Sequence, residues 1–258
     1  MKRAAIVALN TFREAVRDRV LYSLVFFALL MMAAAVIVGQ ISIGIEESVM
    51  VNLGLSAISV IGILIAIFIG VGLVYKEMDK RTLYALLAKP VRRWEFLLGK
   101  FWGLFLTLVV NTTAMALGLF MALLYVKHTL ERSDAVVFVA VYFILLKLAI
   151  LVALALLFSC FTTPLLATLY TAALYVAGLF ATDLRSFHSE RMNPALAKSA
   201  AAISYLLPNF ENFNVMAAAA HGRQVPGELI FQNTIYALIY CAILLIAASL
   251  VFSRRNLK

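Results

Sequence analysis

Charged residues are scarce in this sequence. They make up 14% of its 258 residues, whereas an ordinary soluble domain carries about 25%. Hydrophobic residues make up 64%, and the mean hydropathy is +1.00. So much apolar surface exceeds what the core of one water-soluble domain can bury. The scarcity of charge therefore excludes an ordinary soluble protein and places the excess apolar surface against lipid.

Signatures of catalysis are also missing. No Gly-rich loop ends in Lys-Ser or Lys-Thr, so the chain lacks the P-loop that binds ATP. No carboxylate pair falls in an apolar run, and no nucleophile is matched with a histidine base. The two cysteines, Cys160 and Cys241, lie in or beside apolar runs and indicate no disulfide framework. We therefore predict that the chain is not an enzyme.

Long apolar runs are what the sequence has in place of charge. About 20 apolar residues cross the hydrocarbon core of a bilayer as a helix. The runs lack the alternating pattern of a membrane barrel strand, and lipid then permits only helices. Six transmembrane helices are predicted, at residues 20–38, 53–74, 101–126, 135–158, 165–181 and 235–252. The predicted fold class is an all-α polytopic membrane protein, with residues 1–258 forming a single transmembrane domain.

Basic residues are distributed unevenly over the predicted loops. Fifteen of the 22 lysines and arginines fall on the side that holds both termini, and six fall on the other side. Cytoplasmic loops carry the excess of Lys and Arg, so both termini are predicted to be cytoplasmic. Topology then explains most of the net charge of +9, which argues against a nucleic-acid partner. A cleaved signal peptide is the weaker alternative, because the first apolar run is longer than such segments.

Residues 1–19 have the pattern of an amphipathic helix. Its apolar residues recur at spacings of three and four and form one stripe, while Glu14 and Arg17 belong to the opposite, polar face. Such a helix lies in the plane of the membrane interface, with its cationic side towards the headgroups. The alternative is a charged flank that only orients the first span.

The loop at 75–100 is too long and too patterned for a simple reversal of the chain. Asp79 is a suitable N-cap for a short helix, and Pro90 ends that helix. Its apolar stripe consists of Leu83, Leu86 and Leu87. An apolar stripe on a water-exposed helix indicates a groove on a partner protein. The alternative is that the helix packs on its own chain.

The segment at 182–228 is the longest that is predicted on the outer side. It contains an Ala-rich helix around 194–207, followed by a hairpin whose marker residues are Pro208, Phe210 and Phe213. Phenylalanines beside Asn and Glu predict a hairpin that rests in, or dips into, the outer interface. The three histidines also fall outside the spans, but none forms a ligand-like pair on one element, so we predict no metal site.

Lys147 is the one ionisable residue predicted deep inside a span. A charge at this depth costs about 2.5–3.5 kcal/mol on insertion scales, which favours a role in a substrate path or gate. No acidic residue lies in a span to pair with it, so its partners would be hydroxyls, carbonyls, lipid headgroups or another subunit, and the candidate residues are Asn111, Tyr142 and Tyr170. Asn111 is, with Lys147, a candidate residue of the substrate path or gate. The alternative is a lysine that is satisfied by packing or by snorkelling to the interface.

Several short segments, in their order relative to the six spans, resemble the membrane subunit of ATP-binding cassette exporters of the ABC-2 class. The segments are TFREAVRDR at 11–19, EMDKRT at 77–82 with Lys89-Pro90 after it, Gly99-Lys100, LPNFENF at 207–213, and Arg254-Arg255. More narrowly, the chain resembles the permeases of multicopper-enzyme and nitrous-oxide-reductase maturation. The resemblance covers nearly the whole chain.

The resemblance implies a half-transporter of the bacterial or archaeal inner membrane that pairs with a second copy or a close paralogue. It implies that ATP and Mg²⁺ are bound by a separate ATPase subunit, so that this chain needs no cofactor. The residues expected to contact the ATPase are Glu14, Arg17, Glu77, Asp79, Arg81, Thr82, Leu83, Leu86 and Leu87. The segment at about 191–228 would form a small re-entrant structure.

Glycines are frequent in the second predicted span, where they stand at 54, 62, 70 and 72. Small residues let membrane helices approach closely, so these positions are candidates for the contact between two copies. The alternative is that glycine is simply common in membrane helices.

The leading hypothesis is a permease that couples ATP hydrolysis by its partner to the export or movement of an unidentified substrate. Closure of the ATPase subunits would displace the coupling helix and tilt the second and third spans. The second hypothesis is a mechanotransmitter that relays this motion to a periplasmic accessory protein on 182–228, without bulk transport. A channel or secondary transporter is third, and the lack of intramembrane acids and of an inverted repeat counts against it.

Overall fold

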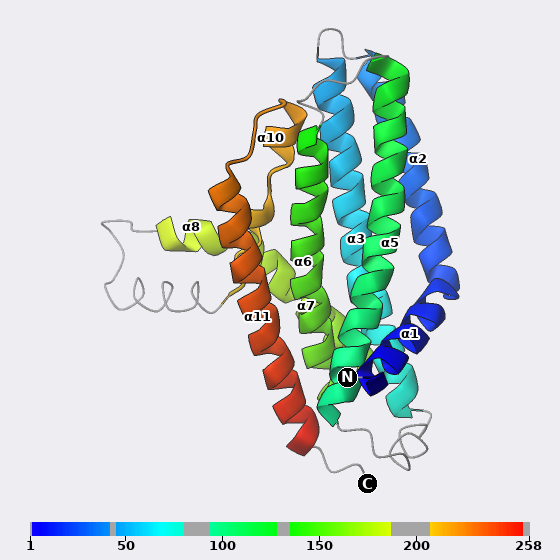
Figure 1. Ribbon diagram of the computed structural model, residues 1–258, viewed down its shortest axis with the longest axis vertical. Coiled ribbons are helices and arrows are strands. Elements are labelled where there is room, and N and C mark those ends of the chain that lie inside the picture. The colour runs from blue at the N-terminus through cyan, green and yellow to red at the C-terminus, as the bar shows by residue number, and fades with distance from the viewer. Residues whose placement is uncertain (1, 42–44, 80–92, 128–134, 187–206, 255–258) are drawn as a thin grey trace.

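The computed structural model describes residues 2–41, 45–79, 93–127, 135–186 and 207–254 (Figure 1). The helices within these ranges are α1 Lys2–Val16, α2 Arg19–Ile41, α3 Glu46–Asp79, α5 Arg93–Lys127, α6 Val136–Ser159, α7 Pro164–Leu179, α8 Ala181–Ser186, the 3₁₀ turn η2 Glu211–Phe213, α10 Met216–Ala220 and α11 Gly227–Arg254. No strand occurs in the described residues. The predicted all-α class is therefore confirmed for this part of the chain.

Four helices are long and apolar enough to cross a membrane, namely the greater parts of α3, α5, α6 and α11. They coincide with four of the six predicted runs. The other two predicted runs coincide with shorter apolar helices, at Leu24–Gly39 within α2 and at Pro164–Leu179. The chain is thus a multi-pass membrane protein, and the count of six spans stays a prediction.

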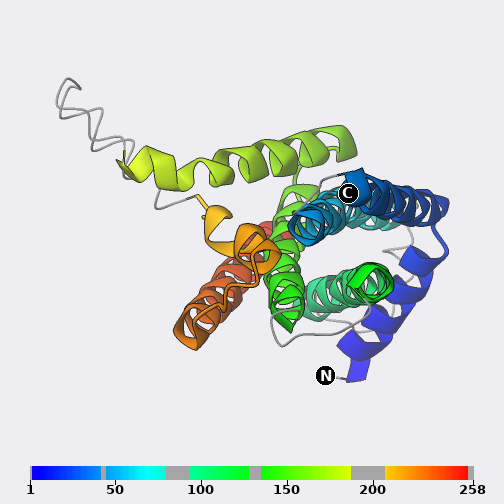
Figure 2. The ribbon, with the colours of Figure 1, turned by 90° about the horizontal axis from the view of Figure 1, so that it is seen from above.

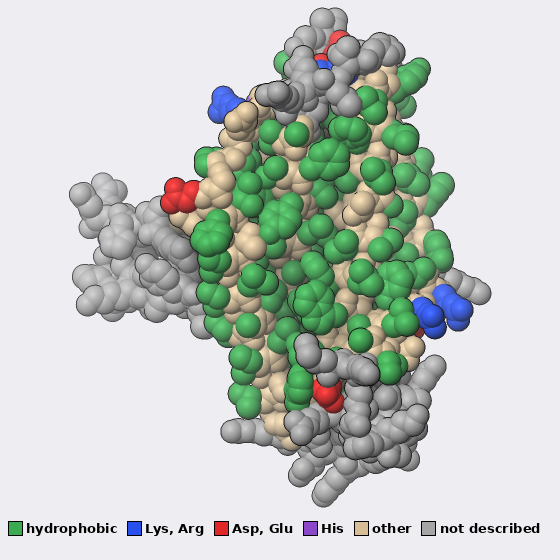
Figure 3. All heavy atoms as spheres, viewed as in Figure 1, with side chains coloured by type: hydrophobic (Ala, Val, Ile, Leu, Met, Phe, Trp, Pro, Cys, Tyr) green, Lys and Arg blue, Asp and Glu red, His purple; other side chains and the backbone are tan. Residues whose placement is uncertain are grey.

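α6 occupies the centre of the bundle (Figures 1 and 2). It packs against α3, α5, α7 and α11, and every side chain from Leu146 to Leu156 is buried. A helix that is apolar on all sides is typical of such a position. On the face of the bundle that Figure 3 shows, hydrophobic side chains predominate between the two ends, as a lipid environment requires.

Both ends of the described chain lie at the same end of the bundle. α1, the last turn of α3, the first turn of α5 and the last turn of α11 lie at that end, while the last turns of α2 and α5 and the first turns of α3 and α6 lie towards the opposite end (Figure 1). An even number of crossings produces this arrangement. It is consistent with the predicted placement of both termini and the 75–100 loop on one side.

Three glycines of α3 bring its neighbours into close contact within one chain. An added Cβ atom at Gly54 would overlap Leu119 of α5, and one at Gly62 would lie 2.7 Å from Leu148 of α6. At Gly70 the nearest atom is the Cβ of an alanine on α6, at 3.3 Å. The prediction that these three glycines contact a second copy is therefore wrong, because the same chain already fills the space beside them.

Candidate functional site

Lys147 lies about midway along α6 with 5% of its surface exposed. Its ammonium group donates a hydrogen bond of 2.6 Å to the hydroxyl of Ser59 on α3, which is buried as well. A buried charge is tolerated only where polar atoms replace the water it has lost. The Lys147–Ser59 pair therefore forms a polar centre between two of the long helices.

The partner of Lys147 is a hydroxyl, one of the predicted kinds, but it belongs to none of the three candidate residues. Asn111 donates instead to a main-chain carbonyl one turn earlier in α5, at 2.8 Å. The hydroxyl of Tyr142 lies 2.8 Å from that of a threonine on α11, and the ring of Tyr170 packs on a phenylalanine of α6. Ser59 stands 88 residues from Lys147 within an apolar run, so no local pattern connects the two.

The hairpin predicted at the outer interface enters the bundle itself. All three of its predicted marker residues, Pro208, Phe210 and Phe213, are buried. The ring of Phe213 packs 6.5 Å from that of Phe143 on α6, and the ring of Phe210 packs 5.2 Å from that of Tyr175 on α7. Phe143 is seven residues into α6, so the hairpin descends about 10 Å past the start of that helix.

Asn209 holds this hairpin in place. Its backbone N–H donates to the hydroxyl of Tyr236 on α11 at 2.9 Å, and its side-chain amide donates to the hydroxyl of Thr182 on α8 at 3.0 Å. Its side-chain oxygen accepts a hydrogen bond of 3.2 Å from the backbone N–H of Glu211. Asn209 thus uses both ends of its amide and its backbone to join three elements.

Glu211 supplies the acidic group that the predicted spans lack. It is exposed on η2, and its carboxylate interacts electrostatically with the ammonium group of Lys147. A search for acids inside the spans misses this residue. The signal that could have found it is its position between two phenylalanines, Phe210 and Phe213, whose burial draws the chain into the bundle.

α7 and the hairpin are in close contact, and we expect a substitution at this contact to lower the stability of the protein. A Cβ atom at Gly178 would overlap the carbonyl oxygen of Pro208, and it would lie 2.6 Å from the ring of Phe210. Gly178→Ala is therefore expected to lower the free energy of unfolding by about 1–3 kcal/mol, the cost of overpacking. Thermal unfolding in detergent measures this. Gly72→Ala is the matched control, because a Cβ there meets no atom within 4 Å, and a comparable loss in it would contradict the argument.

At the opposite end of the bundle, α1 crosses the first turns of α5. A Cβ atom at Gly103 would lie 2.5 Å from the carbonyl oxygen of Ala8, and one at Gly99 would lie 2.8 Å from that of Ala4. Two small residues four apart allow the backbones of membrane helices to touch. This spacing is visible in the sequence, yet hydrophobic periodicity alone does not reveal the contact. α1 is therefore fastened directly to α5.

Glu14 in α1 and Arg17, which directly follows α1, are both exposed. The carboxylate of Glu14 is 3.9 Å from the ammonium group of Lys100, whose side chain is buried in α5. On the other side of α1, Thr11 and Ala15 are buried. The polar face thus remains open to a partner, and the predicted contact of Glu14 and Arg17 with an ATPase stays a prediction.

The coupling segment is described only where it begins. α3 continues past the predicted end of its span at residue 74, so that Glu77 and Asp79 belong to its last described turn. The predicted coupling residues that lie outside the described residues are Arg81, Thr82, Leu83, Leu86 and Leu87, and most of the Ala-rich helix predicted at 194–207 does too.

The chain resembles a known protein family over nearly its whole length. A family model described as "ABC-2 family transporter protein" matches residues 5–257. That range runs from the first turn of α1 to beyond the end of α11. None of the curated proteins matches the chain. The narrower resemblance to maturation permeases stays a prediction.

Proposed function

Because this chain belongs to the ABC-2 family of transporter proteins, whose members are membrane transport components, we propose that it is the permease subunit of an ATP-binding cassette exporter. The family implies an ATPase partner in a separate chain. We further propose that two copies form the transporter, each with six spans and with both termini in the cytoplasm of a bacterial or archaeal cell.

The continuity of α3 carries this proposal. The helix runs unbroken from Glu46 to Asp79, so one rigid element holds both Ser59 and the start of the predicted coupling segment. The twenty residues between Ser59 and Asp79 span about 30 Å. A displacement applied at the coupling end therefore reaches the Lys147–Ser59 pair as a movement of the whole helix.

In the proposed mechanism, nucleotide draws two ATPase subunits together, and each carries the coupling segment of one permease. α3 then tilts against α6 as a rigid body, a two-state change that the nucleotide biases. The Lys147–Ser59 hydrogen bond joins the two helices, and the carboxylate of Glu211 on the hairpin attracts the ammonium group of Lys147 through space. We propose that this polar centre gates a path between the two permease copies.

The proposed orientation can be tested with single cysteines. The native Cys160 and Cys241 are buried, which leaves a low background for thiol labelling. A membrane-impermeant maleimide is expected to label Arg223→Cys in intact cells and to leave Thr82→Cys unlabelled there. In inside-out vesicles, Thr82→Cys should be labelled and Arg223→Cys should not. Labelling of Thr82→Cys from outside would invert the topology.

The proposed function is tested by coexpression with candidate ABC ATPase subunits from the same organism. We expect the two proteins to purify together in detergent, and the ATPase rate of the complex in liposomes to differ from that of the ATPase alone. An ATPase that neither binds the chain nor changes its rate, together with ion conduction by the chain alone, would favour a channel and overturn the proposal.

A second candidate function is supported by a polar hollow at the outer end of the bundle. It has a volume of about 350 Å³ and is lined in part by Glu47, Lys127 and His221. Lys127 and Glu47 form an ion pair of 3.0 Å there. Such a surface suits an accessory protein, as a mechanotransmitter requires. Capture of a neighbouring periplasmic protein that depends on Glu47 would favour this alternative over transport.

A further inference from the structure

A stripe of polar side chains runs along the outer half of α3. Its members stand at spacings of four, four and three residues, namely Ser48, Asn52, Ser56 and Ser59. Residues at these spacings share one face of a helix. Beyond Ser59 the same face continues with Ile63 and Ile67, which are buried and apolar. The polar face of α3 therefore extends from the outer end of the bundle to the level of Lys147 and stops there.

Contacts of three members of the stripe identify what lies opposite it. At the outer end, Ser48 lines the polar hollow together with His221, which follows α10. Further in, the hydroxyl of Ser56 donates to the thioether sulfur of Met216 in α10, at 3.8 Å. At the inner end, Ser59 accepts the hydrogen bond from Lys147. The stripe thus joins the hollow to Lys147 over about 16 Å, the rise of eleven residues of helix.

Solvent exposure falls along the stripe. Asn52 is exposed, Ser56 is half-buried, and Ser59 is 4% exposed. The fall begins where the side chain of Met216 contacts Ser56. A thioether is a weak hydrogen-bond acceptor on an unbranched, flexible side chain, so this contact can be broken at low cost. Met216 therefore forms a movable closure between the hollow and Lys147.

Lys147 requires more polar contacts than the stripe supplies in this closed arrangement. Its ammonium group has three N–H donors, and within the described residues it donates one hydrogen bond, to Ser59. The carboxylate of Glu211 attracts it through space. Buried polar groups with unused donors bind water where several polar partners surround it. Lys147, Ser59 and Glu211 are such partners, so we expect water to reach this centre.

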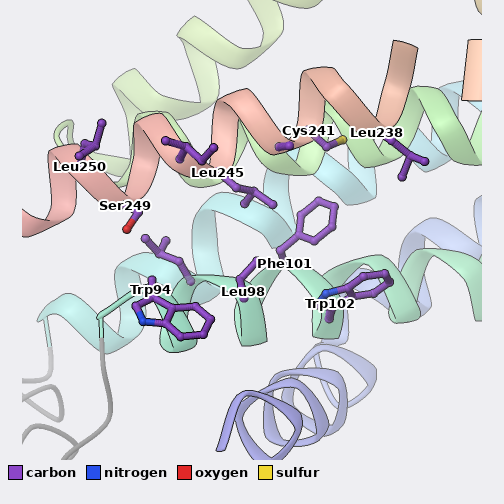
Figure 4. A pocket seen from close by; sticks show the side chains of 12 residues that line it. Trp94, Leu98, Phe101, Trp102, Leu238, Cys241, Leu245, Ser249 and Leu250 are labelled. Carbon is purple, nitrogen blue, oxygen red and sulfur yellow. The ribbon is translucent and has the colours of Figure 1, made fainter. Parts of the chain in front are cut away.

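The groove between α5 and α11 offers no comparable route (Figure 4). It has a volume of about 440 Å³, and apart from Ser249 the described residues that line it are hydrophobic. A hydrophilic solute that enters such surroundings loses its hydrogen bonds to water and gains few in return. A polar route into the bundle therefore follows α3 rather than this groove.

We propose that the polar stripe of α3 is the outer access path to Lys147, that it admits water and small hydrophilic solutes, and that Met216 closes it. The path lies within one chain, between α3 and the segment 211–222, and leads to the gate from the outer side. The proposal rests on the proposed function, because a permease that gates at Lys147 needs a connection from that centre to the outer solution.

The reactivity of single cysteines tests the path. The probe is sulfonatoethyl methanethiosulfonate, a small reagent that does not cross membranes, added on the side from which Arg223→Cys reacts. We expect Ser59→Cys to react from this side, and Ile58→Cys, its buried neighbour on α3, to stay unlabelled. The native Cys241, which lines the apolar groove, gives the background. Equal rates at positions 58 and 59 would overturn the proposal.

Truncation of Met216 tests the closure. Met216→Ala should raise the rate at which Ser59→Cys reacts by about tenfold, which corresponds to a free energy of opening that is lower by about 1.4 kcal/mol. Met115→Ala is the matched control, because Met115 is buried on α5 and its truncation should leave that rate unchanged. An equal rise in both variants, or no rise in Met216→Ala, would overturn the proposal.

The labelling experiments require no ATPase, so their outcome is separate from that of the proposed function. Failure of Ser59→Cys to react, with the ATPase complex intact, would remove the path and leave the permease. Loss of ATPase binding, with the labelling pattern as expected, would remove the permease and leave the path.

Discussion

Leu83→Asp and Leu86→Asp are each expected to abolish co-purification of this chain with its ATPase subunit. Both positions belong to the predicted apolar stripe of the coupling helix, in which i and i+3 share a face. A carboxylate in an apolar partner groove loses its hydration and finds no compensating charge, which costs several kcal/mol. Complex formation is measured by affinity purification of the tagged permease from detergent, followed by quantification of the bound ATPase.

Ala85→Asp is the matched control, because position 85 lies on the opposite side of the same predicted helix. It introduces the same charge into the same segment, yet it should leave the complex intact. Equal loss in all three variants would indicate that the segment misfolds or that its net charge governs binding. Retention of the ATPase in both leucine variants would show that the coupling helix is assigned to the wrong residues.

The apolar runs of the sequence predicted where the long helices of the bundle lie, but they did not predict where those helices begin and end. The run at 101–126 became α5, which begins eight residues earlier at Arg93. Hydrophobicity marks where lipid ends, whereas helical hydrogen bonds continue wherever the backbone and its neighbours permit. α1 packs on this early part of α5 at Gly99 and Gly103, which explains why the helix extends into a region of higher polarity.

The polar centre was predictable only in part. Lys147 stands out in any apolar run because a charge there is costly. Its partner Ser59 does not stand out, because a serine in a membrane helix can satisfy itself on its own backbone. The approach of Glu211 depends on the burial of the hairpin against α6 and α7, and the pairing of segments so far apart in sequence is a product of tertiary packing. Sequence periodicity carries no information about it.

Ser59→Val is expected to lower the free energy of unfolding by about 2 kcal/mol, because it removes the hydrogen-bond acceptor of a buried ammonium group and leaves that group unsatisfied. Lys147→Met should cost much less, since Ser59 can then bond a carbonyl of its own helix. The double variant Ser59→Val, Lys147→Met should recover most of the loss. Thermal unfolding of the four proteins in detergent completes the double-mutant cycle, and strictly additive effects would contradict a direct interaction.

Variants of Lys147 also distinguish a role of this residue in coupling from a contribution to stability alone. Lys147→Met should fold and bind the ATPase, yet the change in ATPase rate that the permease causes should fall by about tenfold, within the usual range of coupling between sites. The reason is that α3 and α6 would then move without the electrostatic attraction between the ammonium group of Lys147 and Glu211 on the hairpin. Lys147→Arg retains the charge and should preserve part of the coupling. Full coupling in Lys147→Met would assign Lys147 to packing alone, because the gate that we propose requires its charge.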